Sequence, residues 1–296
     1  MEYQWYPGHM TKARRMMQEN IKLIDLVIEL VDARIPAASR NPDINDLARG
    51  KPRMILLNKA DLADESATRE WKKFYEALDY QVVALDSRSR TGMKAIESSV
   101  QLACREKIER DRSRGIVNRP VRAMVVGIPN VGKSTFINSF AKKAVARTGN
   151  KPGVTKGKQW IRLSGTLELL DTPGILWPKM GDQLTGLHLA LIGSMNDEIL
   201  DPEQMAISLI GILEQYYPTV LDKRYGLSDP LLSAEDEKGR IRILEEIARV
   251  RGCISKGERA DTAKAAGILL DDFRSGRLGR ISIERPGAIK ETEEDE

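Results

Sequence analysis

The order of three short motifs constrains this 296-residue chain more than any other feature of its sequence. Asn58-Lys-Ala-Asp61 comes first, Gly127-Ile-Pro-Asn-Val-Gly-Lys-Ser134 follows, and Asp171-Thr-Pro-Gly174 comes last. Each motif is typical of one part of a guanine-nucleotide site, and in the usual chain order the phosphate loop precedes the base-reading motif. Because all three parts are present in a rotated order, the sequence predicts a circularly permuted GTPase domain.

The phosphate loop lies between an apolar strand expected over 121–126 and a helix expected to begin near Lys133, which is the context that this motif requires. Gly127 and Gly132 allow backbone N–H groups to surround the β-phosphate, and Lys133 brings a positive charge to the β- and γ-phosphates. We expect Ser134 to place its hydroxyl on Mg²⁺. The predicted nucleotide contacts in this loop are Asn130, Val131, Gly132, Lys133, Ser134 and Thr135.

The base-reading motif follows a buried strand expected over 53–57, at the end where α/β folds bind ligands. The carboxylate of Asp61 can accept two hydrogen bonds from the guanine N1–H and exocyclic amine, which adenine does not offer. We therefore expect Asp61 to select GTP over ATP, with Asn58 and Lys59 as further nucleotide-binding residues. Ser87, after the next strand, is expected to support the guanine carbonyl through its backbone N–H.

The third motif follows a strand about 40 residues after the phosphate loop, where an aspartate reaches Mg²⁺ and a glycine N–H senses the γ-phosphate. These roles fall to Asp171 and Gly174. Thr155 lies between the two motifs and is a candidate Mg²⁺ ligand of the first switch, although an ordinary loop threonine is the alternative. With Lys133, we expect Thr155 and Gly174 to act in catalysis.

Two residues, Ile175 and Asn130, depart from the common GTPase pattern. Ile175 stands where many GTPases carry a glutamine that orients the attacking water, and an aliphatic side chain cannot bind water. His9 and His188 are the only histidines; His9 lies in a turn-like segment, where a structural or surface role remains the alternative to catalysis. The amide of Asn130 can offer an oxygen to a monovalent cation, or the residue can serve only as a turn former.

Apolar, β-branched strands alternate with helical segments in the first part of the chain, which predicts an α/β fold with a doubly wound, mostly parallel sheet. A long helix is expected over 93–111 and a hairpin at Ser164-Gly165. Asp201-Pro202 is a strong helix start in a C-terminal third that is expected to be all helical. The predicted domains are a permuted GTPase domain over 1–180, a helical RNA- or ribosome-binding domain over 181–285, and an acidic disordered tail over 286–296.

Charge and composition point to a basic, cytoplasmic protein without a membrane partner. The net charge is +4, and the last six residues hold five of the 43 acids, so the rest of the chain is more basic still. Residues 105–122 carry seven basic residues against three acids, which fits either a solvated surface or one that faces RNA. Cys104 and Cys253 suggest reduced thiols rather than a disulfide scaffold. No apolar run reaches the roughly 18–20 residues of a membrane span, and the start of the chain is not a signal peptide.

The chain resembles the ribosome biogenesis GTPase A family over nearly its whole length. The resemblance rests on the permuted motif order, the phosphate loop, and three further segments: Trp5-Tyr-Pro-Gly-His-Met10, Leu30-Val-Asp-Ala-Arg-Ile-Pro36 and Leu170-Asp-Thr-Pro-Gly-Ile-Leu-Trp-Pro178. It implies a cytoplasmic GTPase that assists late maturation of the large ribosomal subunit. Such a protein binds the rRNA of the subunit precursor in the GTP state, is stimulated by that contact and leaves after hydrolysis. We expect a monomer with no DNA partner.

The resemblance also implies roles for the departing residues. The family carries an aliphatic residue at the position of Ile175, and its proposed replacement for the missing glutamine corresponds to His9. The family asparagine that corresponds to Asn130 is linked to activation by K⁺. The expected ligands are therefore GTP or GDP, Mg²⁺ at Ser134, Thr155 and Asp171, and K⁺ at Asn130. The alternative function is an RNA-binding placeholder that uses GTP only as an ordering ligand, with negligible intrinsic catalysis.

Overall fold

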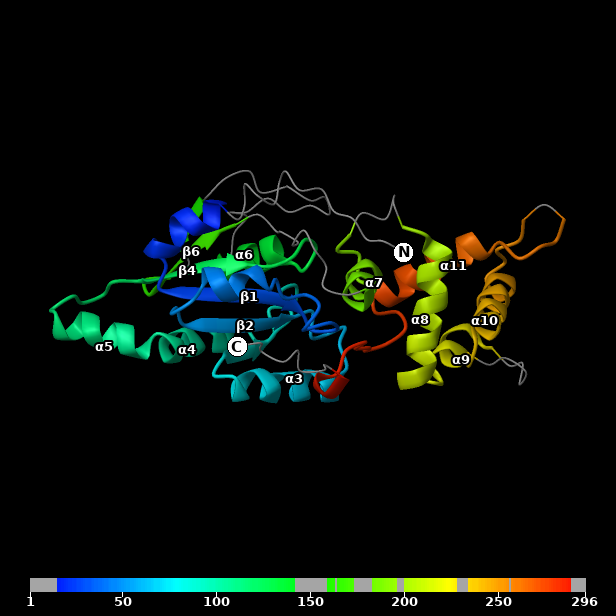
Figure 1. Ribbon diagram of the computed structural model, residues 1–296, viewed down its shortest axis with the longest axis horizontal. Helices are drawn as coiled ribbons and strands as arrows, with labels where there is room; N and C mark the ends of the chain where they lie inside the picture. Colours follow the sequence, from blue (N-terminus) through cyan, green and yellow to red (C-terminus); the bar gives the residue numbers. More distant parts are fainter. Residues whose placement is uncertain are drawn as a thin grey trace. The chain divides into compact units, whose positions relative to one another are not determined.

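The computed structural model describes residues 15–141, 159–162, 164–172, 183–195, 200–227, 234–255 and 257–288 (Figure 1). They fall into two compact units. The first holds the residues up to Gln183 together with those from Glu284 onward, and the second is Leu184–Ile283. His9, Thr155 and Gly174 lie outside the described residues, so their predicted roles stay predictions.

The first unit contains a six-stranded sheet in the order β3-β2-β1-β4-β6-β5. All neighbouring strands are parallel except β5, which is antiparallel to β6. The strands are β1 (Leu26–Asp32), β2 (Arg53–Asn58), β3 (Gln81–Ala84), β4 (Val121–Val126), β5 (Gln159–Arg162) and β6 (Leu167–Asp171). The predicted α/β fold with a mostly parallel sheet is confirmed, including the hairpin that joins β5 to β6.

The strands form because their side chains are buried on both faces, as a parallel sheet covered by helices requires. All seven residues of β1 are buried. Helix α3 (Glu65–Ala77) covers part of the sheet with Trp71 and Tyr75, which pack against Val31 and Leu57. The other helices of this unit include α2 (Asp43–Leu47) and α6 (Lys133–Ala141).

The single helix expected over 93–111 is divided in the structure. Helices α4 (Lys94–Ala103) and α5 (Arg105–Ser113) meet at Cys104, a fully buried residue. Backbone hydrogen bonds continue across the junction, from the N–H of Cys104 to Val100 (3.0 Å) and from that of Ile108 to Cys104 (2.9 Å). The prediction of helical structure was correct, and the prediction of one unbroken helix was wrong.

The second unit is helical in its described residues, with α7 (Gln183–Leu191) leading into it from the first. Its further helices are α8 (Pro202–Tyr216), α9 (Val220–Tyr225), α10 (Glu237–Val250) and α11 (Thr262–Arg274). The helix start predicted at Asp201 is confirmed, because its carboxylate accepts hydrogen bonds from the backbone N–H groups of Glu203 and Gln204. A buried carboxylate, Asp272, gathers Arg224 and Arg251 around it. Within the described ranges, no helix is long and apolar enough to cross a bilayer.

The chain returns from the helical unit to the sheet unit at Glu284. The carboxylate of Glu284 accepts a hydrogen bond from the backbone N–H of Ala37 (2.8 Å), and its carbonyl accepts one from the indole of Trp71 (3.2 Å). The next residue, Arg285, forms a salt bridge with Asp64, the N-cap of α3 (3.5 Å). These contacts lie within the sheet unit and hold its last described segment, just before the short helix η3 (Pro286–Ala288).

Candidate nucleotide-binding site

The described parts of the three motifs meet at the carboxyl edge of the sheet. Strand β2 ends at Asn58, β4 leads directly into the phosphate loop, and β6 ends at Asp171. Because β1, β2, β4 and β6 are parallel, their carboxyl ends lie on one side; Asp32 pairs with Asn58 in register, and Val125 with Asp171. Segments more than 100 residues apart in sequence thus share the edge where open α/β sheets bind ligands.

Asn58 joins the base motif to two other loops. Its side-chain Nδ2 donates to the carbonyl of Val131 in the phosphate loop (2.7 Å). Its Oδ1 accepts from the backbone N–H (3.2 Å) and the hydroxyl (2.7 Å) of Ser87, after β3. All three residues are buried, so these hydrogen bonds form away from solvent. The predicted nucleotide-binding residues Asn58 and Ser87 therefore hold loops of the site in register with each other.

Lys59 makes a second connection between the same two motifs. Its Nζ donates to the carbonyl of Asn130 (2.8 Å) and forms a salt bridge with Asp32 at the end of β1 (3.0 Å). Burial lowers the pKa of Lys59, and the charge of Asp32 opposes that effect without reversing it. The side chain of Lys59 therefore connects the base motif to the phosphate loop, and its salt bridge with Asp32 fixes its position.

Asp32 and Arg34 belong to this site although they were not among the predicted site residues. Asp32 is fully buried, and Arg34 binds both of its oxygens at 2.9 Å. Burial alone would raise the pKa of Asp32, but the charges of Arg34 and Lys59 outweigh it and hold that pKa far below its ordinary value. The sequence did hold one signal for this pair, an acid at the end of a strand of buried residues. A buried carboxylate without a basic partner is strongly destabilising, so such an acid predicts a salt bridge.

Two glycines of the phosphate loop are required by close contacts. A Cβ at Gly132 would lie 2.6 Å from Nδ2 of Asn58, and the backbone there has φ +96°. A Cβ at Gly127 would lie 2.8 Å from the carbonyl oxygen of Leu30. Asn130 has φ +60°, in the left-handed region that asparagine tolerates better than most residues. The loop can thus pass close to β1 and β2 only with glycine at these two positions.

Helix α6 begins where the phosphate loop ends, so its first N–H groups point toward the same edge. Lys133 is its first residue, and Ser134 and Thr135 follow in the first turn. A helix N-terminus attracts anions through its free N–H groups and its dipole. Thr172, directly after β6, donates its hydroxyl to the carbonyl of Val125 (2.6 Å) and so ties the start of the third motif to β4. This arrangement suits a bound polyphosphate.

The oxygen donors predicted for Mg²⁺ fit a hard cation. Ser134 supplies a hydroxyl and Asp171 a carboxylate, which are ligand types that Mg²⁺ prefers. Register places Asp171 opposite Val125, two residues before the phosphate loop begins. Thr155 lies outside the described residues.

Asp61 presents an exposed carboxylate beside the base-motif lysine. Partial burial and the nearby charge of Asp86 raise its pKa. Asp86 itself is stabilised as an anion by hydrogen bonds, including one from the backbone N–H of Arg88 (2.8 Å), and its pKa lies below the ordinary value. Two carboxylates in this corner favour a ligand that offers hydrogen-bond donors, as guanine does.

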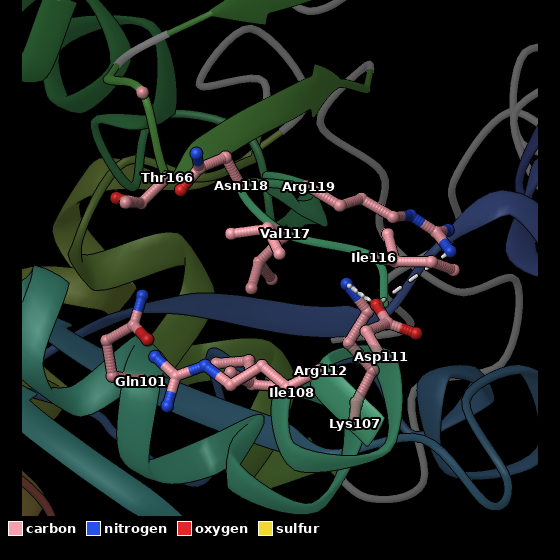
Figure 2. Close-up of a pocket in the computed structure, with 12 residues that line it drawn as sticks. Gln101, Lys107, Ile108, Asp111, Arg112, Ile116, Val117, Asn118, Arg119 and Thr166 are labelled. Atoms are coloured by element: carbon pink, nitrogen blue, oxygen red, sulfur yellow. Dashed lines mark ion pairs between the residues drawn. The ribbon is translucent and has the colours of Figure 1, made fainter. Parts of the chain in front are cut away.

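A cavity lies at the opposite end of the sheet (Figure 2). It has a volume of about 150 Å³ and is lined by α5, the linker after it, and Val121 and Thr166 at the starts of β4 and β6. The nucleotide motifs follow the carboxyl ends of the strands, so this cavity is not part of the nucleotide site.

Comparisons with known proteins match this chain to GTPases. Residues 122–210 match the model of a family described as 50S ribosome-binding GTPase. A Bacillus cereus protein named ribosome biogenesis GTPase A is 43% identical over 295 residues, which cover 100% of this chain and 98% of the relative. The GNP-bound crystal structure of YlqF from Thermotoga maritima aligns with a TM-score of 0.61 and 27% identity, over 94% of this chain and 100% of that one. A GDP-bound YlqF structure aligns with a TM-score of 0.60 and 26% identity, over 92% and 99%.

Proposed function

Since this chain belongs to the ribosome biogenesis GTPase A family and is a GTPase, we propose that it assists late maturation of the large ribosomal subunit. Its GTPase domain is circularly permuted, with the base motif on β2 and the phosphate loop after β4. In this proposal the protein binds the rRNA of the subunit precursor in the GTP state as a monomer, and hydrolysis releases it. The meeting of the motifs at one sheet edge, where Asn58 joins two of them, supports a GTP-dependent function most directly.

We assign the base to Asp61 and the phosphates to the loop that ends in α6. Lys133 and the backbone of Asn130, Val131 and Gly132 would surround the β-phosphate. Ser134 and Thr135, in the first turn of α6, stand at the helix end that favours anions. The hydrogen bonds of Asn58 and Lys59 support this assignment, because they fix the phosphate loop against the base motif.

Two cations complete the proposal. Ser134, Thr155 and Asp171 would hold Mg²⁺, and the amide oxygen of Asn130 would face K⁺. When bound, these ions offset the negative charge that the phosphates carry and develop. The left-handed backbone of Asn130 turns the loop sharply just before the expected β-phosphate position, which is compatible with this assignment and with a turn former alone.

His9 is our candidate for orienting the attacking water, because Ile175 cannot do so. Gly174 would sense the γ-phosphate through its N–H. The alternative, an RNA-binding placeholder with negligible catalysis, finds less support, because the matched family and the Bacillus cereus relative are both described as GTPases.

The γ-phosphate would act on RNA binding through the chain that follows Thr172. In this circular permutation, the third motif leads into the helical unit and not back into the sheet. Ordering of Gly174 by GTP can therefore bias the helical unit, and the coupling must be reciprocal: a subunit that prefers the GTP state also tightens GTP binding.

Co-sedimentation with large ribosomal subunits tests the proposal. We expect binding in GTP and in a non-hydrolysable analogue, weak binding in GDP, and faster GTP turnover when subunits are present. Equal subunit affinity in all three nucleotide states would contradict a GTP-gated factor. Absence of stimulated turnover would favour the placeholder alternative.

A further inference from the structure

The end of α5 carries three arginines without salt-bridge partners, Arg110, Arg112 and Arg114, which we call the basic tip. All three side chains are exposed, and none forms a salt bridge with an acid among residues 15–141 or the other described ranges. Arginine in the last turn of a helix also suits the helix dipole, which accounts for part of their placement. The dipole does not account for three guanidiniums without a salt bridge within five residues.

Salt bridges within α5 leave an excess of positive charge at the end of the helix. Glu109 forms a salt bridge with Arg105 (2.9 Å), and Asp111 forms one with Lys107 (3.0 Å). Two of the three acids of this helix are thereby engaged by basic residues nearer its start, and Glu106 is the third. The sequence alone left both a solvated surface and an RNA-facing surface open for 105–122, with the solvated surface favoured. The pairing separates the neutralised part of the helix from the charged tip.

The surface beside the basic tip is a hollow of mixed lining, in which apolar side chains such as Val117 stand among polar and charged ones (Figure 2). Gln101, Asn118 and Thr166 line the cavity of about 150 Å³ and offer hydrogen-bond donors and acceptors. Arg119, also in its lining, is 43% exposed and approaches acids only at 3.9 Å. Guanidiniums next to exposed amide groups suit a polyanion with hydrogen-bonding sugars and bases.

We infer that the basic tip and the adjoining cavity bind the phosphate backbone of RNA, as a contact that does not depend on the bound nucleotide. The cavity includes Val121 at the start of β4, whereas the phosphate loop follows Val126 at its end. Five residue steps along a strand span about 17 Å. That distance is about twice the Debye length at physiological salt, so the nucleotide charge reaches the tip only weakly.

This inference deepens the proposed function, on which the identity of the RNA rests. The proposed gating acts on the helical unit through the segment after Thr172, at the other edge of the sheet. The basic tip would add a constant electrostatic attraction, so that the GDP state still associates loosely with RNA before and after hydrolysis. The bound nucleotide would then set the affinity of the final complex, and the basic tip would set the rate of association with RNA.

Counterion release sets the size of the expected effect. Each phosphate neutralised by a basic side chain contributes about 0.7–0.9 to the slope of log affinity against log salt. If all three arginines contact phosphates, their removal lowers that slope by about 2–3. At about 0.1 M salt this corresponds to an affinity loss of about 100-fold or more.

The test uses the full-length protein with two probes, large ribosomal subunits and a single-stranded homopolymer RNA. Affinity is measured at several KCl concentrations, in GDP and in a non-hydrolysable GTP analogue. One variant removes the basic tip, and a charge-matched control removes three exposed basic residues of α3, two of which have acidic partners. The variants are Arg110→Ala with Arg112→Ala and Arg114→Ala, and, as control, Arg69→Ala with Lys72→Ala and Lys73→Ala.

The inference expects the tip variant to lose affinity for both probes by the same factor in both nucleotides, with the smaller salt slope, while the control loses less than about threefold. Replacement of the three arginines by lysine should keep the slope. Wild-type affinity and slope in the tip variant would overturn the inference, and so would a loss confined to the GTP state. If wild type binds the homopolymer through the tip but does not bind subunits in a GTP-dependent way, the proposed function fails and the inference stands. Unfolding midpoints of all variants identify any that has lost its fold.

Discussion

Replacing Asn58 by alanine should damage the nucleotide site more than any other single truncation on β2. The change removes three hydrogen bonds, one to Val131 and two from Ser87. A neutral hydrogen bond contributes about 0.5–1.5 kcal/mol net, and a buried group left without its partner costs about 1–3 kcal/mol. Water can enter the space of the lost side chain and reduce that cost, so we expect a total of about 2–4 kcal/mol.

The loss should appear mainly in nucleotide affinity, because the hydrogen bonds of Asn58 hold loops rather than the core of the sheet. Titration with a fluorescent GDP analogue should show affinity lowered by about 30- to 700-fold, at 1.4 kcal/mol for each factor of ten. Ser87→Ala removes one of the three hydrogen bonds and should cost about a third as much. Asn45→Ala is the matched control, since its side chain is exposed and accepts one hydrogen bond, from Arg53 (2.7 Å).

Thermal unfolding of the same samples distinguishes a loss of nucleotide affinity from a loss of folding stability. If about 2 kcal/mol were lost from the fold instead, the unfolding midpoint would fall by about 4–8 °C. GDP affinity of Asn58→Ala equal to that of Asn45→Ala would refute the reasoning, because the hydrogen bonds to Val131 and Ser87 would then not organise the site.

Four further outcomes follow from the proposed roles. Asp61→Asn should weaken GTP binding by roughly 1.5–3 kcal/mol and favour xanthosine triphosphate, which competition between the two nucleotides measures; unchanged GTP affinity would remove Asp61 from the base site. Lys133→Ala should abolish tight GTP binding or turnover with an unaltered circular dichroism spectrum, and near-normal turnover would mean that the phosphate loop is misassigned. His9→Ala should bind GTP normally but lose about 10²–10⁴-fold of the subunit-stimulated rate, and equal stimulated rates would return His9 to a structural role. Exchange of K⁺ for Na⁺ should slow hydrolysis in a stopped assay, and an absent effect would free Asn130 from the cation role.

The sheet and the meeting of the motifs were predictable because buried parallel strands are continuous apolar runs, and their carboxyl ends share one edge. The pairing of Asp32 with Lys59 was not predictable, because Asp32 ends β1, Lys59 follows the end of β2, and a single sequence holds no record of which strands are neighbours. For the same reason the hydrogen bonds of Asn58 could not be assigned, although its place in the motif was clear. The predicted roles of His9 and Thr155 remain predictions.

Local patterns failed where an element is short or depends on distant contacts. The sequence predicted a helical region that includes α7 and α9 but not these two helices individually, because α7 is apolar on most sides and α9 has only six residues, so neither shows a helical period. The division at Cys104 interrupts an amphipathic pattern that continues on both sides. Glu284 follows no periodic segment, and its role depends on backbone N–H groups nearly 250 positions away.

The return of the chain at Glu284 makes the helical unit an insertion that is anchored at both ends. A unit linked by one end can sample a sphere set by its linker, whereas one linked by both ends keeps fewer orientations, and the closed loop of about 100 residues lowers the entropy that any further ordering must remove. One attachment follows the third motif in the sequence, and at the other Glu284 and Arg285 bind the turn after β1 and the N-cap of α3. Any change of conformation in the segment after the third motif would therefore act on a unit whose other end stays tied to the turn after β1.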